Sequence, residues 1–475
     1  METNPIVLFE LDVAVPAQQF RIEYTLVDKG GLPVVPEFLL RLLKVSALMP
    51  AEIAKYFGFS AKELSVAMIP FIKNGEIRIR PDGKAELTET GLRLFSESHE
   101  TPIVKRKEER QQTFTFDLLA FSYLGRSLKS FESKRTLELQ AATETLTESC
   151  RFAVEAFMGQ LYDIHRMGHL GGQQQERLPP ELYKVADTQK VREGWEILVE
   201  RATIDADARQ VRFIAIEGLR ENEAYLRQRT EQLSRQTTTE NFELVLRLVD
   251  IFGDAESYDF LRSGGLDLQA FNVTAASAIN SDTRIFGSLQ LQENWNKVVS
   301  LLGKHRKELK RTHQGEPLKL TWLAPASHGL WGKSARHGEI CSAFNELSDA
   351  KAQRGKGDKL FEVKVLIPLS GDRDMQGIKR ARSDCSEAKN LLCGFVESEV
   401  LAPIEAIILE GRLAVVLYHL VIPEMSQVPI PFGFVTENAS RVDMLGKFIN
   451  STLEEYVAGN TPRFLGPIEK SKGNQ

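Results

Sequence analysis

The N-terminal part of the chain alternates between apolar and polar residues. In the segment FRIEYTLVD, every second residue from Phe20 to Leu26 is apolar, and most of the residues between them are polar or charged. A period of two is typical of a half-buried β-strand. The preceding stretch VLFELDVAV alternates in the same way, and Gly30 and Gly31 end the pattern. Residues 6–27 are therefore predicted to form two strands.

The pattern changes to a helical period after residue 33. Apolar residues recur every three or four positions in PEFLLRLLKVSAL, in AEIAKYFG and in a third segment that starts near residue 61. Ser60 and Glu63 have the spacing of a capping box, which starts this third helix. The residues that follow, EIRIRPDGKAELT, predict a hairpin whose turn is the Asp-Gly pair. Residues 33–95 are thus expected to contain three helices, a hairpin and a short closing helix.

The middle of the chain has mainly helical patterns, and its last third is α/β. The charged segment KRKEERQQ (105–112) is interpreted as a linker or a solvated helix end, and 187–263 as mostly helical with one strand at 211–219. From residue 318, the segments LKLTWLA, FEVKVLIP, IEAIILE, RLAVVLYHL and PFGFVTE predict five strands between helices. We therefore expect a mixed α/β, multi-domain chain with these parts: 1–100 (strands and the helix-hairpin segment), 113–285 (mostly helical), 286–460 (α/β) and 461–475 (a disordered tail).

Charge and cysteine content narrow the function classes. The 475 residues include 60 Lys and Arg against 65 Asp and Glu, a net charge of −5, which excludes a uniformly basic protein but not local basic patches. The four cysteines include no C-x-x-C pair, and Cys385 and Cys393 have no histidine nearby, so no zinc site is predicted. His165 and His169 are four residues apart without a glutamate between them, so no metal is predicted there either.

Targeting signals also bear on the location of the chain. The N-terminus has no basic segment followed by an apolar one, as a secretion signal would. The longest apolar candidate, IEAIILEGRLAVVLYHLVIP, contains three charged residues and is interpreted as two strands. Few cysteines in a long chain indicate free thiols in a reducing compartment. The predictions are a cytoplasmic location and no membrane partner.

The stretch from Ile53 to Leu87 resembles the winged helix-turn-helix superfamily. It contains I-A-x-x-x-G, a short turn, a helix, N-G-x-I and a hairpin, followed by L-T-x-x-G. One departure is Pro70, which removes a backbone donor inside the third helix and is expected to kink or shorten it. The resemblance implies that the third helix enters the major groove of double-stranded DNA and that the hairpin contacts the backbone or minor groove. The residues then expected on DNA are Lys62, Ser65, Lys73, Arg78, Arg80 and Lys84.

An alternative use of the same domain is docking of a protein partner. Glu63 and Glu76 dilute the basic charge of the segment, and the number of exposed basic residues is modest. A docking function predicts an acidic or apolar face on the third helix, whereas DNA binding predicts a basic face. The sequence leaves both hypotheses open.

The stretch PIEAIILEGRLAVV resembles one half of a phospholipase D-like domain. Active members carry a histidine, a lysine two residues later and an aspartate before a glycine, and this chain has Pro403, Glu405 and Glu410 at those places. The histidine is the nucleophile and needs cationic neighbours. The resemblance therefore implies an inactive unit. Similar degenerate units serve as sensory or dimerisation domains in archaeal regulators that carry winged helices, which makes a homodimer a candidate assembly.

Two other patterns suggest contacts with phosphate. The segment GLWGKS, which ends at Ser334, lies between a strand and a helix as a phosphate-binding loop does, but Ser327 replaces the first glycine of the full motif. The run KHRKELKR ends a long helix; it is either a phosphate-contacting surface or a solvated helix end with cations near the C-terminus. The candidate phosphate contacts are Lys304, Arg306, Lys307, Lys310, Arg311 and Lys333.

These patterns favour a DNA-binding protein that is not an enzyme. It would be a regulator, or the DNA-recognising subunit of a bacterial antiviral defence or DNA-processing system with other protein subunits. No catalytic residue, metal or cofactor is predicted. The alternatives from other classes are a nuclease that uses His305, or His328 and His337; a nucleotide hydrolase that uses Lys333; and a protein-interaction scaffold.

Overall fold

A computed structural model of the chain divides it into two compact units. It describes residues 5–95, 100–128, 134–170, 181–204, 211–215, 222–236, 240–262, 282–312, 315–326, 329–351, 359–426, 428–454, 456–457 and 461–468. Unit 1 comprises Met1–Pro16, Ser130–Gln140 and Trp195–Gln475, and unit 2 comprises Ala17–Lys129 and Ala141–Gly194. The predicted mixed α/β class is confirmed. Within the described residues, no helix combines the length and the apolar character needed to cross a membrane.

Strand β1 (Ile6–Gly31) is one strand of 26 residues, not the two strands predicted. Its second half pairs antiparallel with β4 (Ile103–Asp117), so the segment 105–112 is a strand and the prediction of a linker or helix end was wrong. A segment with charged side chains can still form a strand, because the hydrogen bonds between strands join backbone N–H and C=O groups. The strand order in this sheet is β5–β4–β1–β7–β8, where β5 is Tyr123–Gly125, and β6 (Leu137–Glu138) pairs with β1.

Strand β7 (Glu181–Ile204) corrects the prediction that residues 187–263 are mostly helical. Its first two-thirds are rich in Lys, Glu, Gln and Arg, which are good helix formers, but most of these side chains are exposed on a strand. Backbone pairing with neighbouring strands overrides that local preference. The predicted strand at 211–219 is present as β8 (Val211–Ala215), and the remaining elements of this region are helices: α8 (Glu223–Arg235), α9 (Phe242–Ile251) and α10 (Ala255–Arg262). The helices α5 (Thr143–Thr147), α6 (Ser149–Gly159) and α7 (Leu161–Arg166) precede β7.

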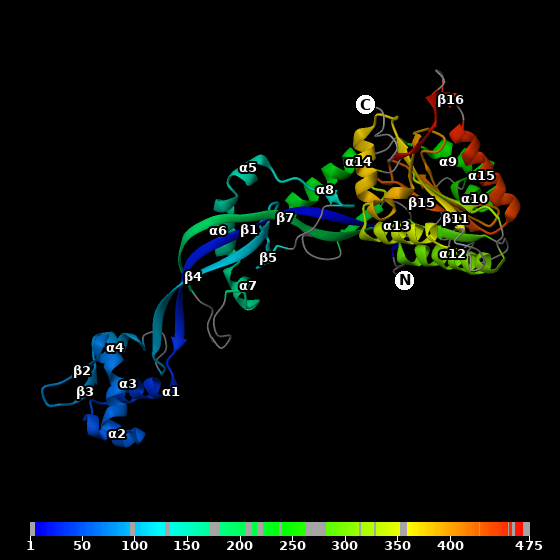
Figure 1. Cartoon of the computed structure of the whole chain (residues 1–475). Helices are drawn as coiled ribbons and strands as arrows, with labels where there is room; N and C mark the ends of the chain where they lie inside the picture. The colour runs from blue at the N-terminus through cyan, green and yellow to red at the C-terminus, as the bar shows by residue number, and fades with distance from the viewer. Residues whose placement is uncertain are drawn as a thin grey trace, which may run out of the picture. The chain divides into compact units, whose positions relative to one another are not determined.

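Residues 34–95 of unit 2 form a helix-hairpin module. Its elements are α1 (Val34–Val45), α2 (Pro50–Phe57), α3 (Ala61–Lys73), β2 (Ile77–Ile79), β3 (Ala85–Leu87) and α4 (Glu89–Arg93), and they lie together in Figure 1. Gly58 ends α2 with a φ of 69°, and the capping box between Ser60 and Glu63 starts α3. Helix α3 does not end early: Pro70 is exposed, and the helix continues to Lys73.

An eight-stranded mixed sheet organises unit 1. The strand order is β18–β12–β11–β10–β13–β14–β15–β9. Strands β10 (Leu318–Leu323), β11 (Phe361–Leu369) and β12 (Leu392–Val396) are parallel, whereas β13 (Ile404–Leu409), β14 (Leu413–Leu420), β15 (Ile430–Thr436) and β9 (Thr283–Phe286) pair antiparallel. The five strands predicted here are present, and β9, β12 and β18 (Phe464–Pro467) were missed. Strand β18 lies in the expected disordered tail, where pairing with β12 orders it.

Every residue of β13, β14 and β15 is buried, so both faces of this sheet are covered by other elements. One core contains Trp322, Val365 and Leu417 with residues of α12 (Gln292–Thr312), α13 (Ala335–Ser348) and α14 (Met375–Asp384). On β14, Tyr418 points away from that core and stacks on Phe252, which lies at the end of α9. Phe252 also meets Phe448 of α15 (Ala439–Glu454).

The close packing of β14 against β15 predicts a strong effect of a single methyl group. A Cβ on Gly433 would lie 1.9 Å from the backbone oxygen of Val416, whereas a Cβ on Gly303 of α12 meets nothing within 4 Å. We expect Gly433→Ala to lower the free energy of unfolding of unit 1 by about 2 kcal/mol or more. Gly303→Ala should raise it by about 0.5–1 kcal/mol, because alanine costs less backbone entropy in a helix.

Urea unfolding followed by tryptophan fluorescence checks this prediction, since all four tryptophans (Trp195, Trp295, Trp322 and Trp331) belong to unit 1. Equal stability of the two variants would contradict it.

Candidate functional site

Helix α3 presents the three residues expected to face the major groove. Lys62, Ser65 and Lys73 are all exposed. The opposite side of the helix packs into the module core through Leu64, Met68 and Phe71. Helical spacing places Lys62 and Lys73 near the centre of the solvent-facing side, with Ser65 at its flank.

The two acidic residues that dilute the charge in the sequence have structural roles. The Glu63 carboxylate accepts hydrogen bonds from the backbone N–H and hydroxyl of Ser60, both at 2.8 Å, and these bonds lower the pKa of Glu63. Glu76 is buried, and burial raises its pKa. Glu63 therefore stays ionised and offsets part of the charge of Lys62 at the start of α3, whereas Glu76 is removed from the surface.

The hairpin residues are exposed but partly neutralised. The Arg78 guanidinium donates to the Glu86 carboxylate at 2.6 Å, and Arg80 lies 3.6 Å from both Glu86 and Asp82. Lys84 is exposed in the same hairpin. Ion pairs at the surface contribute only about 0–1 kcal/mol, so a phosphate can compete for these arginines.

The same face also contains apolar side chains. Val66 is 66% exposed and Ile69 is 42% exposed, and both lie between the two lysines along the helix. Ile72 is 40% exposed at the edge of this face. A basic and apolar surface can contact thymine methyl groups beside phosphates, or an apolar patch of another protein.

The basic run at the end of α12 is dispersed in the structure. The Lys304 ammonium lies 2.9 Å from Glu437, and this pair lowers the pKa of the Glu437 carboxyl. His305 is buried and also contacts Glu437, at 2.8 Å. Lys307 and Arg311 are exposed, and Arg306 and Lys310 are half-buried. The basic run precedes β10 in the chain, whereas Lys333 lies in the segment that follows β10.

Lys333 instead lines a crevice at the carboxyl ends of the parallel strands. This crevice has a volume of about 810 Å³, and its charged lining residues are Lys134, Glu138, Lys333, Lys379, Arg380 and Asp384. The Lys333 ammonium pairs with the Asp384 carboxylate at 3.0 Å. Loops at these strand ends are the usual ligand sites of open α/β sheets. The sequence did not predict Lys134 as part of this group, since it is about 200 residues from Lys333 and no local pattern links them.

The N-terminus of α13 argues against a phosphate-binding loop at Gly329–Ser334. In such a loop the first backbone N–H groups of the helix hold the phosphate. Here the Ala335 N–H donates to the Asp12 carboxylate at 2.7 Å, and the Arg336 guanidinium donates to Glu10 at 3.2 Å. The anion position is therefore taken by a carboxylate of β1. A nucleotide hydrolase that uses Lys333 is not supported by this geometry.

The positions compared with phospholipase D-like enzymes form a buried network. Glu405 is 2% exposed, and its Oε1 accepts hydrogen bonds from the indole N–H groups of Trp322 (3.1 Å) and Trp331 (3.0 Å). His419 of β14 lies 3.3 Å from Oε2 of the same carboxylate. Pro403 precedes β13, and Glu410 follows it. A carboxylate therefore occupies the place of the expected lysine and is fully used by its neighbours.

Of the histidines considered for a nuclease, the two that the structure describes lie on different helices. His305 is buried on α12, and His337 is buried on α13, where Trp322 and Trp331 pack against its ring. His328 lies outside the described residues. The sequence missed the neighbours of His337, which are Cys341 and Cys385. The four-residue spacing of His337 and Cys341 was the one available signal, because it places both on the same side of a helix.

The contact between Asp12 and α13 predicts a pH-dependent stability. Burial raises the pKa of Asp12 above its ordinary value, so the folded state binds this proton more tightly than the unfolded state does. The stabilisation is complete at low pH and declines as the pH rises through the ordinary value to the raised one. Asp12→Asn removes this titration and keeps an oxygen acceptor for Ala335. Asp12→Ala loses the cap and should cost about 1 kcal/mol more than Asp12→Asn.

Urea unfolding of both variants and the native chain at pH 3 to 7, again followed by tryptophan fluorescence, tests this. A stability difference between the native chain and Asp12→Asn that is constant with pH would contradict a raised pKa of Asp12 in the folded state.

The chain was compared with protein families, curated proteins and solved structures. No family model, curated protein or solved structure matches the chain. The resemblances to winged helices and to phospholipase D-like domains therefore rest on the residues and elements described above.

Proposed function

We propose that residues 34–95 form a winged helix-turn-helix module that binds double-stranded DNA. The observation that carries the proposal is the exposed side of α3, where Lys62, Ser65 and Lys73 are accessible, while Glu63 caps the start of the helix and Glu76 is buried. In this proposal α3 enters the major groove and the β2–β3 hairpin is the wing. Lys62, Lys73 and Lys84 contact phosphates, and Ser65 lies beside base edges.

In this proposal, the two arginines of the hairpin bind DNA by replacing their carboxylate partners with DNA phosphates. Arg78 and Arg80 are paired with carboxylates of the same hairpin, and the Arg78 side chain is 69% exposed. Approach of a DNA phosphate offers each guanidinium a second anion, and release of condensed counterions favours the exchange. Binding through these residues is therefore strongly weakened by salt.

The α/β unit fits an inactive phospholipase D-like domain within the same proposal. Its element order of β10, α13, β11 and α14, followed by four more strands and α15, supports the resemblance. Pro403 stands where active members have the nucleophilic histidine, and Glu405 stands where they have a lysine, so the nucleophile and the cation that the reaction needs are both missing from these positions. The Glu405 carboxylate is, moreover, bound to two tryptophans. The function proposed for the whole chain is that of a non-enzymatic regulator, or of a DNA-recognising subunit of a bacterial defence or DNA-processing system.

The exposed apolar residues of α3 support a second candidate function. Val66 and Ile69 lie between Lys62 and Lys73, so this face suits a protein partner with an apolar patch flanked by carboxylates. In that case the module would be a docking platform, and duplex DNA would not bind. The experiment for the first candidate distinguishes the two.

We expect the full chain to bind a random-sequence duplex with an affinity that falls steeply as salt increases. A plot of log affinity against log salt has a negative slope. The double variant Lys62→Ala, Lys73→Ala should make this slope less steep by about two, one for each lost phosphate contact. The triple variant Arg78→Ala, Arg80→Ala, Lys84→Ala should make it less steep by up to about three. Fluorescence anisotropy of labelled duplex across a salt series measures both slopes.

A matched control is Lys297→Ala with Lys389→Ala, which removes two exposed lysines of unit 1 and should leave the slope unchanged. The duplex is expected to remain uncut in the presence of magnesium. No binding at low salt, or equal weakening by the control, would move the function to protein docking. Val66→Ser with Ile69→Ser should then abolish co-purification of a defined partner.

A further inference from the structure

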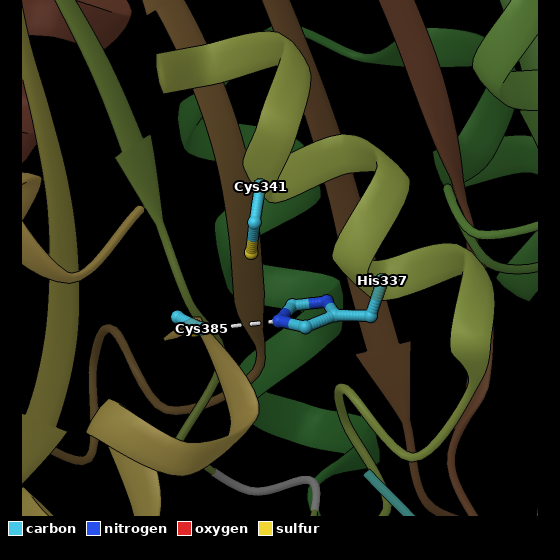
Figure 2. A group of neighbouring side chains, drawn as sticks. All are labelled: His337, Cys341 and Cys385. Carbon is cyan, nitrogen blue, oxygen red and sulfur yellow. Dashed lines mark hydrogen bonds between the residues drawn. The ribbon is translucent and has the colours of Figure 1, made fainter. Parts of the chain in front are cut away.

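Three soft or borderline metal-binding side chains meet inside unit 1. His337 and Cys341 project from the same side of α13, and Cys385 caps the end of α14 and faces them (Figure 2). All three residues are fully buried, at 0% exposure. They come from two helices that pack on the same face of the sheet, so the group is held by the core and not by a surface loop.

The distances match those between the ligands of a tetrahedral metal ion. The donor atoms of the three residues all lie within 4.8 Å of one another. The His337 Nε2 atom is 3.4 Å from Cys385 Sγ. Zinc bonds of about 2.0 Å to nitrogen and 2.3 Å to sulfur place two tetrahedral ligands about 3.5 Å apart. The side chains thus need only small adjustments to bind one ion.

The surroundings of His337 fix the orientation of its ring. Trp331 packs edge-on with its ring centre 4.5 Å from that of the imidazole, and Trp322 lies at 5.3 Å. The backbone of Gly332 passes so close that a Cβ there would lie 3.3 Å from the ring. The Gln290 amide lies 3.4 Å from Nδ1, and its oxygen can accept the Nδ1 proton if the amide is turned over. This is the kind of outer contact that orients a metal-bound histidine.

The charges of such a site balance. A hydrogen bond with Cys341, together with burial, raises the pKa of the Cys385 thiol, so Cys385 stays neutral unless a cation is present. A bound divalent cation releases the thiol protons, because it stabilises the thiolates directly. Two thiolates and a neutral imidazole around a divalent ion have no net charge. The filled site would therefore bury no uncompensated charge.

We propose that His337, Cys341 and Cys385 bind one thiophilic divalent cation, with zinc as the best match for two sulfurs and one nitrogen. The three protein ligands leave a fourth position. Cys385 also lines a smaller crevice of about 280 Å³ at the carboxyl ends of the strands, together with Lys333, Asp384 and Glu397. A water molecule from this crevice is the fourth ligand. The site is independent of the DNA-binding proposal, whose residues all lie in unit 2.

Metal titration of the full-length chain tests the site. The chain is purified under reducing conditions, stripped with a chelator and titrated with Zn²⁺ or Co²⁺. We expect about one ion per chain by elemental analysis, and a thiolate-to-cobalt charge-transfer band in the near ultraviolet. Cys341→Ser and Cys385→Ser should each weaken zinc binding at least about tenfold and diminish the cobalt band.

The matched control is Cys393→Ser, which changes a buried thiol of β12 outside the group and should leave both readouts unchanged. Tryptophan fluorescence of each variant without metal shows whether unit 1 is folded. If the two serine variants do not fold, protection of the native thiols from alkylation by Zn²⁺ tests the same site. The proposal is overturned if the native chain produces no cobalt band, or if a Cys341–Cys385 disulfide is present under reducing conditions. Retention of the ion by both serine variants would also overturn it.

Discussion

The burial of strands β13, β14 and β15 on both faces is the constraint on which unit 1 depends. Because every residue of these strands is buried, other elements must cover the sheet on both sides. One of these layers contains α13 and α14, which pack with the parallel strands β10 and β11. The loops at the ends of the parallel strands then form the crevice with Lys333, and the two helices bring His337, Cys341 and Cys385 together. Both the crevice and the proposed metal site thus follow from the way the sheet is covered.

Two groups of buried polar residues in this unit are held together by several contacts each. Glu405 binds two indoles and a histidine, and Arg284 is 7% exposed between Asp254 and Glu256. Removing one member of such a set leaves a buried charge or dipole without compensation, which costs more than the interaction itself contributes. The cluster of His337, Cys341 and Cys385 differs, because its members contact one another only weakly. A bound cation would replace these weak contacts with metal–ligand bonds.

Unit 2 has a different design, in which charge is kept at the surface. The helix-hairpin module has a small apolar core, and three of its acidic residues have structural roles: Glu63 caps α3, Glu76 is buried and Glu86 pairs with Arg78. Lysines remain on the outer side of α3. This separation of structural carboxylates from accessible cations allows a chain with a net charge of −5 to present a locally basic surface. The proposed division of labour is DNA recognition in unit 2 and an inactive, metal-binding α/β domain in unit 1.

The sequence by itself determined the elements whose signals are local. The helical periods and the capping box of residues 34–95 were found with nearly correct bounds, and so were the apolar strands after residue 318, because turns, caps and amphipathic faces depend on near neighbours. Tertiary structure decided the rest. Strands β4 and β7 carry charged, helix-favouring sequences and exist because other strands pair with them. Lys134 lines the same crevice as Lys333, Asp12 accepts from the first turn of α13, and Cys385 lies beside His337 only in the folded structure. Such contacts join residues far apart in the chain, and no local spacing encodes them.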